Sequence, residues 1–210
     1  MELHPRSPSA MPRFVIAVAV LLLVSACATQ SPVIQVETSR YHRLTSPVVG
    51  RDVVILANAD QSPGDEFATY ADLIGQALEN LGWRVVELPD QAAAVLRFRW
   101  AVDAPVVETV LTPSAIPPMG NMWGYRRSTW GADPFPYWQA QRVTHYPKWL
   151  SVTIVEANQP SAAPLFEGRV TSRRGGTAMA PIMPYLVRGM FDGFPGPNGA
   201  VEAKALEVQP

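Results

Sequence analysis

The sequence is most informative in what it has little of, beginning with cysteine and histidine. Cys27 is the only cysteine among 210 residues. An internal disulfide is therefore excluded, and so is a thiolate cage for zinc. Of the three histidines, His42 and His145 lie far apart, and neither has a second histidine or an acid four residues away. We therefore expect no metal site and no cofactor.

An excess of positive charge is also missing. The chain carries 17 lysine and arginine residues against 18 acidic ones, which gives a formal net charge of -1 and a pI near 6.3. Nucleic-acid binding depends on neutralising phosphates with basic side chains, so this balance argues against a nucleic-acid partner.

Motifs for nucleophilic or phosphate chemistry are lacking as well. The sequence has no Gly-x-Ser-x-Gly turn and no Ser-x-x-Lys helix start, and the glycines at 175–176 do not form a phosphate-binding loop. We assign no catalytic residue and expect a protein that is not an enzyme. One alternative stays open: an envelope hydrolase directed at glycans or lipids, because such chemistry needs only two carboxylates that composition cannot single out.

A hydrophobic run long enough to cross a membrane does not occur either. The apolar stretch at 14–24 follows Arg6 and Arg13 and is much shorter than the roughly 20 residues that a membrane-spanning helix needs. Its length suits the core of a signal peptide. Val24, Ser25, Ala26 and Cys27 follow directly, and this pattern resembles the bacterial lipobox.

The lipobox resemblance implies cleavage between Ala26 and Cys27 and a lipid-modified Cys27 at the mature N-terminus. We therefore expect residues 1–26 to be a lipoprotein signal peptide and residues 27–40 a tether, with palmitate on Cys27 and attachment to the membrane. Ala28, rather than aspartate, follows the cysteine, which favours the outer membrane and its periplasmic side. Two alternatives stay open: an ordinary secretory signal with an incidental Cys27, and translation from Met11.

A β-α-β unit is expected over residues 53–88. Residues 53–56 are a β-branched block typical of a buried strand, and 83–88 form a second strand. Between them, apolar residues recur at helical spacing from Phe67 to Leu81. Ser62 is the expected N-cap of this helix, and Gly82 the expected left-handed residue at its end. A connection of this length with a helix in it favours parallel strands.

The remaining elements predict an α+β domain over residues 41–195 with a tail at 196–210. Strands are expected at 93–103, 148–157 and 165–172, and a helix at 181–191 with Pro184 in its first turn. In the strand at 93–103, Leu96, Phe98, Trp100 and Val102 alternate with polar side chains. We expect one small mixed sheet of about five to six strands.

Residues 111–148 differ in composition from the rest, being rich in proline and aromatic side chains. A loop of this length is generally functional or disordered, and its aromatics argue against simple disorder. We predict that it binds a partner through arginines placed beside aromatic rings. The residues concerned are Trp123, Tyr125, Arg126, Arg127 and Trp130. The alternative is that the loop folds over a sheet face as an accessory core.

Taken in order, several segments resemble the bacterial lipoproteins of the domain of unknown function 4136 family. They are the lipobox cysteine, the helix opening at 66–71 and closing at Leu81-Gly82-Trp83, the strand at 92–102, Trp123-Gly124-Tyr125, the strand at 165–169, and Phe194-Pro195-Gly196. The resemblance implies a small periplasmic α+β lipoprotein domain and supplies no catalytic residues. We therefore expect a non-enzymatic binding or assembly module whose partner is an envelope protein, a lipid or peptidoglycan.

Overall fold

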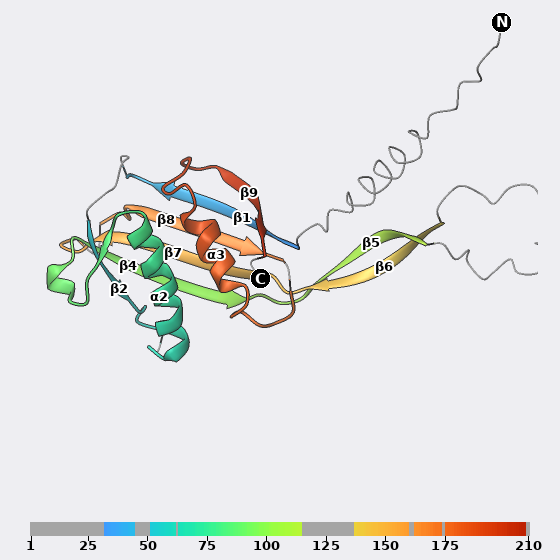
Figure 1. Cartoon of the computed structure of the whole chain (residues 1–210), viewed down its shortest axis with the longest axis horizontal. Coiled ribbons are helices and arrows are strands. Elements are labelled where there is room, and N and C mark those ends of the chain that lie inside the picture. The colour runs from blue at the N-terminus through green and yellow to red at the C-terminus, as the bar shows by residue number, and fades with distance from the viewer. Residues whose placement is uncertain are drawn as a thin grey trace, which may run out of the picture. The chain divides into compact units, whose positions relative to one another are not determined.

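The protein has a mixed α+β fold, seen here in a computed structural model. The structure describes residues 32–44, 51–61, 63–114, 137–159, 162–173 and 175–208, without the side chains of Ser114 and Tyr137. Residues 33–206 belong to one compact unit. The expected α+β class is confirmed (Figure 1). The signal peptide, Ala26, Cys27 and most of the tether lie outside the described residues.

The main sheet has seven strands in the order β3-β2-β4-β7-β8-β1-β9. The strand pair β2–β4 is parallel, whereas β4, β7, β8 and β1 are successively antiparallel. The sheet is larger than the five to six strands expected. Its strands are β1 Val33–His42, β2 Asp52–Leu56, β3 Arg84–Val85, β4 Ala94–Val102, β7 Lys148–Glu156, β8 Phe166–Ser172 and β9 Val201–Glu207.

The β-α-β unit has the predicted form. Helix α2, Asp65–Asn80, connects β2 to β3, and the two strands are parallel with Val53 opposite Val85. Gly82 has the expected left-handed conformation, with φ of 84°. The predicted N-cap was wrong. Gly64 is the capping residue, and it has no side chain with which to cap the first turn.

The two helices lie on the same face of the sheet (Figure 1). Helix α3 is Met183–Phe191, and Pro184 occupies its first turn as predicted. Both helices bury apolar side chains at helical spacing, and the matching alternate residues of β4, β7 and β8 are fully buried. This core includes Ile74, Leu78, Leu96, Phe98, Leu150, Ile154, Phe166, Leu186 and Met190.

Aromatic stacking fixes α2 on β4. The Phe67 and Phe98 rings stack with centroids 4.8 Å apart, and Tyr70 meets Trp100 edge-on at 5.1 Å. The alternation predicted for this strand is confirmed at Leu96 and Phe98, which are buried. Trp100 is only half-buried although it contacts rings of α2, and Val102, the last residue of the strand, is exposed.

The C-terminal segment differs from the prediction. Residues 201–207 form the edge strand β9 beside β1, where a loose tail over 196–210 was expected. Strand β1 likewise begins at Val33, inside the expected tether and ahead of the predicted domain start at residue 41. Both ends of the predicted domain were therefore placed too far inward.

A buried arginine ties these ends to the core. The Arg40 side chain is 2% exposed and donates to the backbone oxygens of Gly189 (2.8 Å) and Met190 (3.1 Å) at the end of α3. It also pairs with Glu202 of β9 at 2.9 Å. Burial lowers the pKa of Arg40 below its usual value, and Glu202 opposes that shift. The buried guanidinium therefore links β1 to the end of α3 and to β9 through charge-assisted hydrogen bonds.

A second, two-stranded sheet lies where a loop was predicted. Strands β5, Val106–Ser114, and β6, Tyr137–His145, form an antiparallel hairpin. The expected loop at 111–148 was therefore wrong for residues 111–114 and 137–145, which belong to strands. None of the helices among the described residues is long and apolar enough to cross a membrane.

Candidate functional site: the β5–β6 hairpin and an acidic groove

The β5–β6 hairpin is fixed at its base by hydrogen bonds. The backbone N–H of Asp103 donates to the Pro147 oxygen at 2.8 Å, and the Trp149 indole N–H donates to the Asp103 carboxylate at 3.0 Å. Beyond this base the strands pair in continuous register from Val106 opposite His145 to Ser114 opposite Tyr137. The hairpin is thus a regular ribbon that leads to the segment 115–136.

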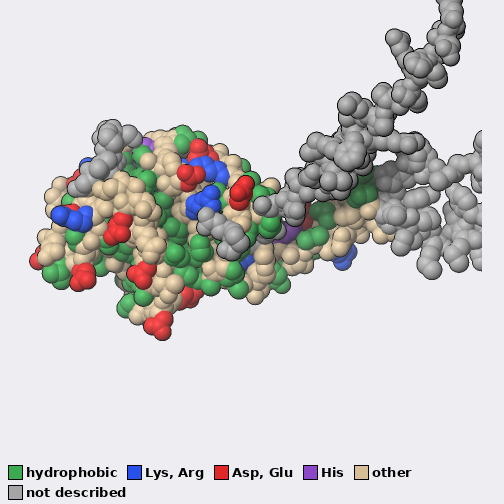
Figure 2. All heavy atoms as spheres, viewed as in Figure 1, with side chains coloured by type: hydrophobic (Ala, Val, Ile, Leu, Met, Phe, Trp, Pro, Cys, Tyr) green, Lys and Arg blue, Asp and Glu red, His purple; other side chains and the backbone are tan. Residues whose placement is uncertain are grey.

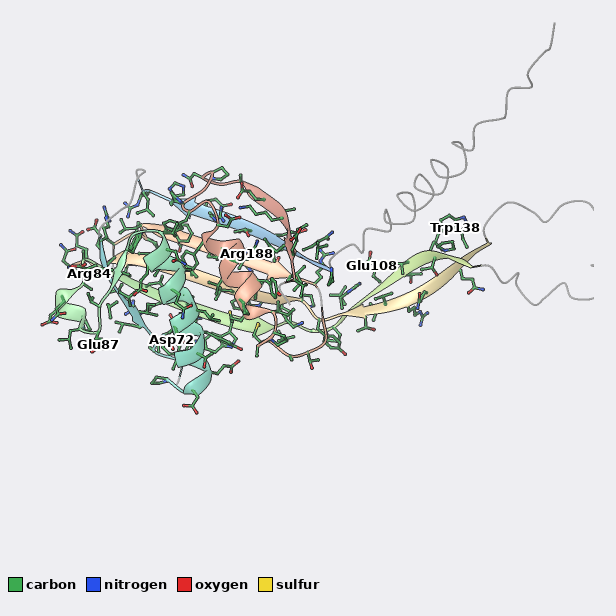
Figure 3. The ribbon with its side chains drawn as sticks, viewed as in Figure 1. Asp72, Arg84, Glu87, Glu108, Trp138 and Arg188 are labelled. Atoms are coloured by element: carbon green, nitrogen blue, oxygen red, sulfur yellow. The ribbon has the colours of Figure 1, made fainter. Side chains whose placement is uncertain are left out.

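The register places a group of apolar side chains on one face of the ribbon. Directly opposed residues in an antiparallel pair share a face. Leu111 lies opposite Ala140, and Pro113 lies opposite Trp138. We call these four residues the tip patch. Leu111 is 65% and Trp138 61% exposed. Figure 2 shows hydrophobic side chains along the hairpin, and Figure 3 places Trp138 at the start of β6, near the tip of the hairpin.

The opposite face of the ribbon is more polar. His145 Nε2 lies 3.5 Å from the Glu108 carboxylate, and Gln139 and Gln141 are exposed. The hairpin therefore has one face that is apolar near its tip and an opposite face that mixes these polar groups with the valines at 106, 110 and 143. Neither face is buried in the described structure. Such asymmetry is typical of a strand ribbon that packs against something on one side only.

The exposed ribbon is energetically unusual. An isolated two-stranded hairpin is at best marginally stable in water. Covering apolar surface stabilises by about 25 cal/mol per Å², so a partner that covered Leu111 and Trp138 would gain from this term, which offsets part of the entropy lost on association. Clustered exposed apolar side chains of this kind mark interaction sites more often than isolated ones do. The hairpin is the strongest candidate for a partner-binding surface.

The predicted binding residues adjoin this hairpin in sequence. Trp123, Tyr125, Arg126, Arg127 and Trp130 all belong to the segment 115–136, which lies outside the described residues. Strand β5 leads into that segment and β6 leads out of it. Their role in binding stays a prediction, and so does the accessory-core alternative.

A groove between α2 and the β3 edge of the main sheet is a second candidate. Its volume is about 340 Å³, at the lower end of the range for ligand pockets. The floor is apolar and the rim carries exposed carboxylates (Figure 3). The floor contains Val54, Ile55, Ala71, Val85 and Val86; the rim contains Asp72, Glu79 and Glu87.

Two features of the backbone shape this groove. Gly75 places no side chain on the helix side of the groove, where a Cβ would lie at an ordinary contact distance of 3.7 Å from Val85 Cγ2. In β3, the N–H groups of Arg84 and Val86 donate to Arg51 and Val53 of the neighbouring segment. Backbone direction alternates along a strand, so Val85 and Glu87 direct their groups to the outer edge. The groove therefore adjoins an open strand edge.

One ion pair lies beside the groove, on β2 and β3. Arg84 contacts Asp52 through two bonds of 2.6 Å. The hydrogen bond from Arg84 lowers the pKa of the Asp52 carboxyl, and the same bond raises the pKa of Arg84. Among the residues that line the groove and are described, none is basic. The rim carboxylates thus form a negative surface without a lining cation.

Two further titratable groups are buried in the main sheet and its helices. Burial, together with a 2.9 Å hydrogen bond to Glu66, raises the pKa of Tyr70 to about 12. Burial lowers the pKa of Lys148, whose ammonium donates to the backbone oxygens of Tyr146 and Gly176. Both groups hold the fold together and are separate from the groove. In the described ranges, no group of three histidine, cysteine or acidic residues is placed to hold a metal ion.

Neither surface is evident from the sequence, for identifiable reasons. The strand β5 was marked by Val106, Val107 and Val110, a β-branched run that the surrounding prolines obscured. Trp138 was counted with the loop, although it lies in β6. The groove acids come from an ordinary polar helix face and from the end of a short strand, and only the fold brings them together. Arg99, by contrast, pairs with Asp60 at 2.9 Å, as a solvated strand face predicts.

Comparisons with known proteins give similarities of low identity. No protein-family profile and no curated protein matches the chain. A PelC dodecamer from Paraburkholderia phytofirmans is 12% identical, over 73% of this chain and 93% of that one, with a TM-score of 0.38. A PDZ domain protein from Parabacteroides distasonis ATCC 8503 is 10% identical, over 89% and 41%, with a TM-score of 0.42. A domain of unknown function 4136 family protein from Bacteroides thetaiotaomicron VPI-5482 is 12% identical, over 76% and 95%, with a TM-score of 0.39. At these identities and scores the similarities assign no function to the chain.

Proposed function

We propose that the protein is a membrane-anchored cell-envelope lipoprotein of the domain of unknown function 4136 family that acts as a non-enzymatic binding or assembly module. In this proposal Cys27 carries the lipid, and the folded domain faces the periplasm from the outer membrane. The lipobox sequence supports the anchor. The exposed β5–β6 hairpin carries the binding role, because its apolar face has no counterpart among the described residues to cover it.

The partner that best suits the hairpin is an envelope protein. A regular strand ribbon offers unpaired backbone groups at its edges as well as apolar side chains on one face, and a protein strand can use both. Lipid and peptidoglycan remain the other partners that the sequence suggests. Lipid would use the apolar face alone, and peptidoglycan would use Trp138 with the polar groups around it.

Site-specific photo-cross-linking in intact envelopes tests the binding role. A photoreactive residue at position 111, in the tip patch, should form a discrete adduct with an envelope protein. The same residue at position 141, on the polar face, is the matched control and should give little adduct. Equal labelling at both positions, or none at either, would count against binding through the tip patch.

The anchor has a separate test. Cys27→Ser should abolish palmitate labelling and move the protein out of the membrane fraction, because stable anchoring requires the acyl chains. Ser25→Thr, which keeps the cysteine, is the control. Palmitate labelling that persists in Cys27→Ser would refute the lipoprotein proposal without affecting the hairpin.

The hydrolase alternative concerns a different part of the molecule. Within the described chain, the acid-rimmed groove is the concave site where two carboxylates could act. Its acids are exposed, whereas a glycosidase holds its general acid in apolar surroundings. Turnover of glycan or lipid substrates that is lost in Asp72→Asn/Glu87→Gln would favour the hydrolase.

A further inference from the structure

The acidic groove has the properties of a docking site for a short extended segment. Its floor is apolar, its rim is negative, and the outer edge of β3 runs beside it. An extended chain added along that edge could pair with the backbone of Val85 and Glu87 while its side chains enter the groove. The occupant that fits these features carries aromatic and positively charged residues close together.

One segment of the chain itself has that composition. Residues 119–132 contain Arg126 and Arg127 together with Trp123, Tyr125 and Trp130, and they contain no acidic residue. In an extended conformation, side chains two residues apart share a side. Tyr125 and Arg127 would then face one way together, so that an aromatic ring could meet the apolar floor while a guanidinium meets the rim.

The segment of a second copy can reach the groove more readily than the segment of the same chain. The groove lies beside the start of β4, where Val54 pairs with Val95. The hairpin that leads to the segment begins beyond Val102, at the other end of β4. That end is about 23 Å away along the strand. This separation within one molecule does not restrict the segment of a neighbouring molecule. Anchoring of both copies to one membrane would raise the local concentration of the chain.

We propose that the groove formed by α2 and β3 binds residues 119–132 of a second copy of this chain, through the rim acids Asp72, Glu79 and Glu87 and the arginines Arg126 and Arg127. The contact is heterologous, since the groove and the segment are different surfaces of the molecule. The local-concentration step rests on the proposed anchor, but the contact itself does not.

A mixing experiment with two variants tests this pairing. The groove variant is Asp72→Asn/Glu79→Gln/Glu87→Gln, and the segment variant is Arg126→Ala/Arg127→Ala. Sedimentation of the full-length chain in detergent should show that each variant alone self-associates about tenfold more weakly than the unmodified chain. A mixture of the two should recover a dimer, because one intact groove and one intact segment remain. The dimer should weaken in 1 M salt.

The controls separate specific pairing from altered net charge. Glu37→Gln/Asp90→Asn/Glu167→Gln removes the same number of exposed acids outside the groove and should self-associate like the unmodified chain. A synthetic peptide of residues 119–132 should bind the segment variant and lose binding to a chain that carries both sets of changes. Self-association that survives in both variants, or a mixture that recovers nothing, would overturn the proposal. Cys27 is unchanged throughout, so failure here is distinct from failure of the anchor.

Discussion

The main sheet and the β5–β6 hairpin differ in how far their paired strands are covered by other elements. In the main sheet, α2 and α3 cover one face, and the central strands β4, β7 and β8 bury alternate side chains, except at the end of β4. In the hairpin, the pairing is just as regular, yet Val106, Val107, Leu111 and Trp138 are all more than half exposed. Strand pairing alone therefore does not bury the side chains of a strand. The main sheet is stabilised by the apolar side chains that it buries against the helices. The hairpin lacks such burial among the described residues, and this favours a partner that covers it.

The largest effect is expected at the buried arginine of the main sheet. Arg40→Met leaves Glu202 without its partner and removes the Arg40 donors from the backbone oxygens at the end of α3, of which the Gly189 oxygen keeps its bond from Thr38 Oγ1. Breaking a fully buried pair costs about 3–5 kcal/mol, and because Glu202 is 32% exposed we expect the low end of this range, about 3 kcal/mol. Urea unfolding should therefore show a loss of that size. Arg99→Met, which breaks the exposed pair with Asp60, is the control and should cost less than about 1 kcal/mol.

A smaller loss is expected where the helix touches the sheet. Gly189 of α3 lies against β1, and a Cβ there would be 2.9 Å from Val36 Cγ2 and 3.2 Å from Val170 Cγ2. Gly189→Ala should destabilise by about 1–3 kcal/mol through overpacking. Gly176→Ala, where a Cβ meets nothing within 4 Å, is the matched control. Equal unfolding midpoints for the two variants would contradict this account of α3 packing.

The buried tyrosine predicts a pH dependence confined to alkaline conditions. The pKa of Tyr70 is about 12 in the folded chain and about 10 when unfolded. The folded form therefore holds its proton more tightly. The stabilisation is complete below pH 10 and is lost as the pH rises through 12. Its size is up to about 2–3 kcal/mol.

Unfolding of the unmodified chain and of Tyr70→Phe between pH 9 and 12 measures this term. The difference in stability between the two should shrink across the window, because the variant has no phenol to titrate. Parallel pH profiles would show that Tyr70 does not contribute the expected linkage.

The smallest effect on stability is expected in the hairpin. Leu111→Ser/Trp138→Ser alters side chains that are already 65% and 61% exposed. The free energy of unfolding should therefore change by less than about 0.5 kcal/mol. Adduct formation from a photoreactive residue at position 107, on the same face of the ribbon, should fall sharply in this variant. A large loss of stability would instead place the tip patch in the core.

Local patterns were enough to predict part of the fold. The β-α-β unit and α3 could be placed from apolar spacing, Gly82 and Pro184, because these signals act within a few residues. Strand β9 could not be predicted, since its place beside β1 depends on Arg40 and Glu202 meeting across the fold. The hairpin was missed because its side chains are exposed, so the burial pattern that marks most strands is absent. The groove acids could not be predicted as a group, because only the contact of α2 with β3 brings them together.

The main proposal is that a partner in the envelope covers the β5–β6 hairpin. Hydrogen exchange of the hairpin amides, measured in intact envelopes and in the purified protein, is its most direct test. In the purified protein, the amides of β5 and β6 should exchange far faster than those of β4 and β7, because an uncovered two-stranded ribbon opens easily. In envelopes the partner should slow exchange in β5 and β6 and leave the main sheet unchanged. Hairpin amides that exchange equally fast in both preparations would contradict the account.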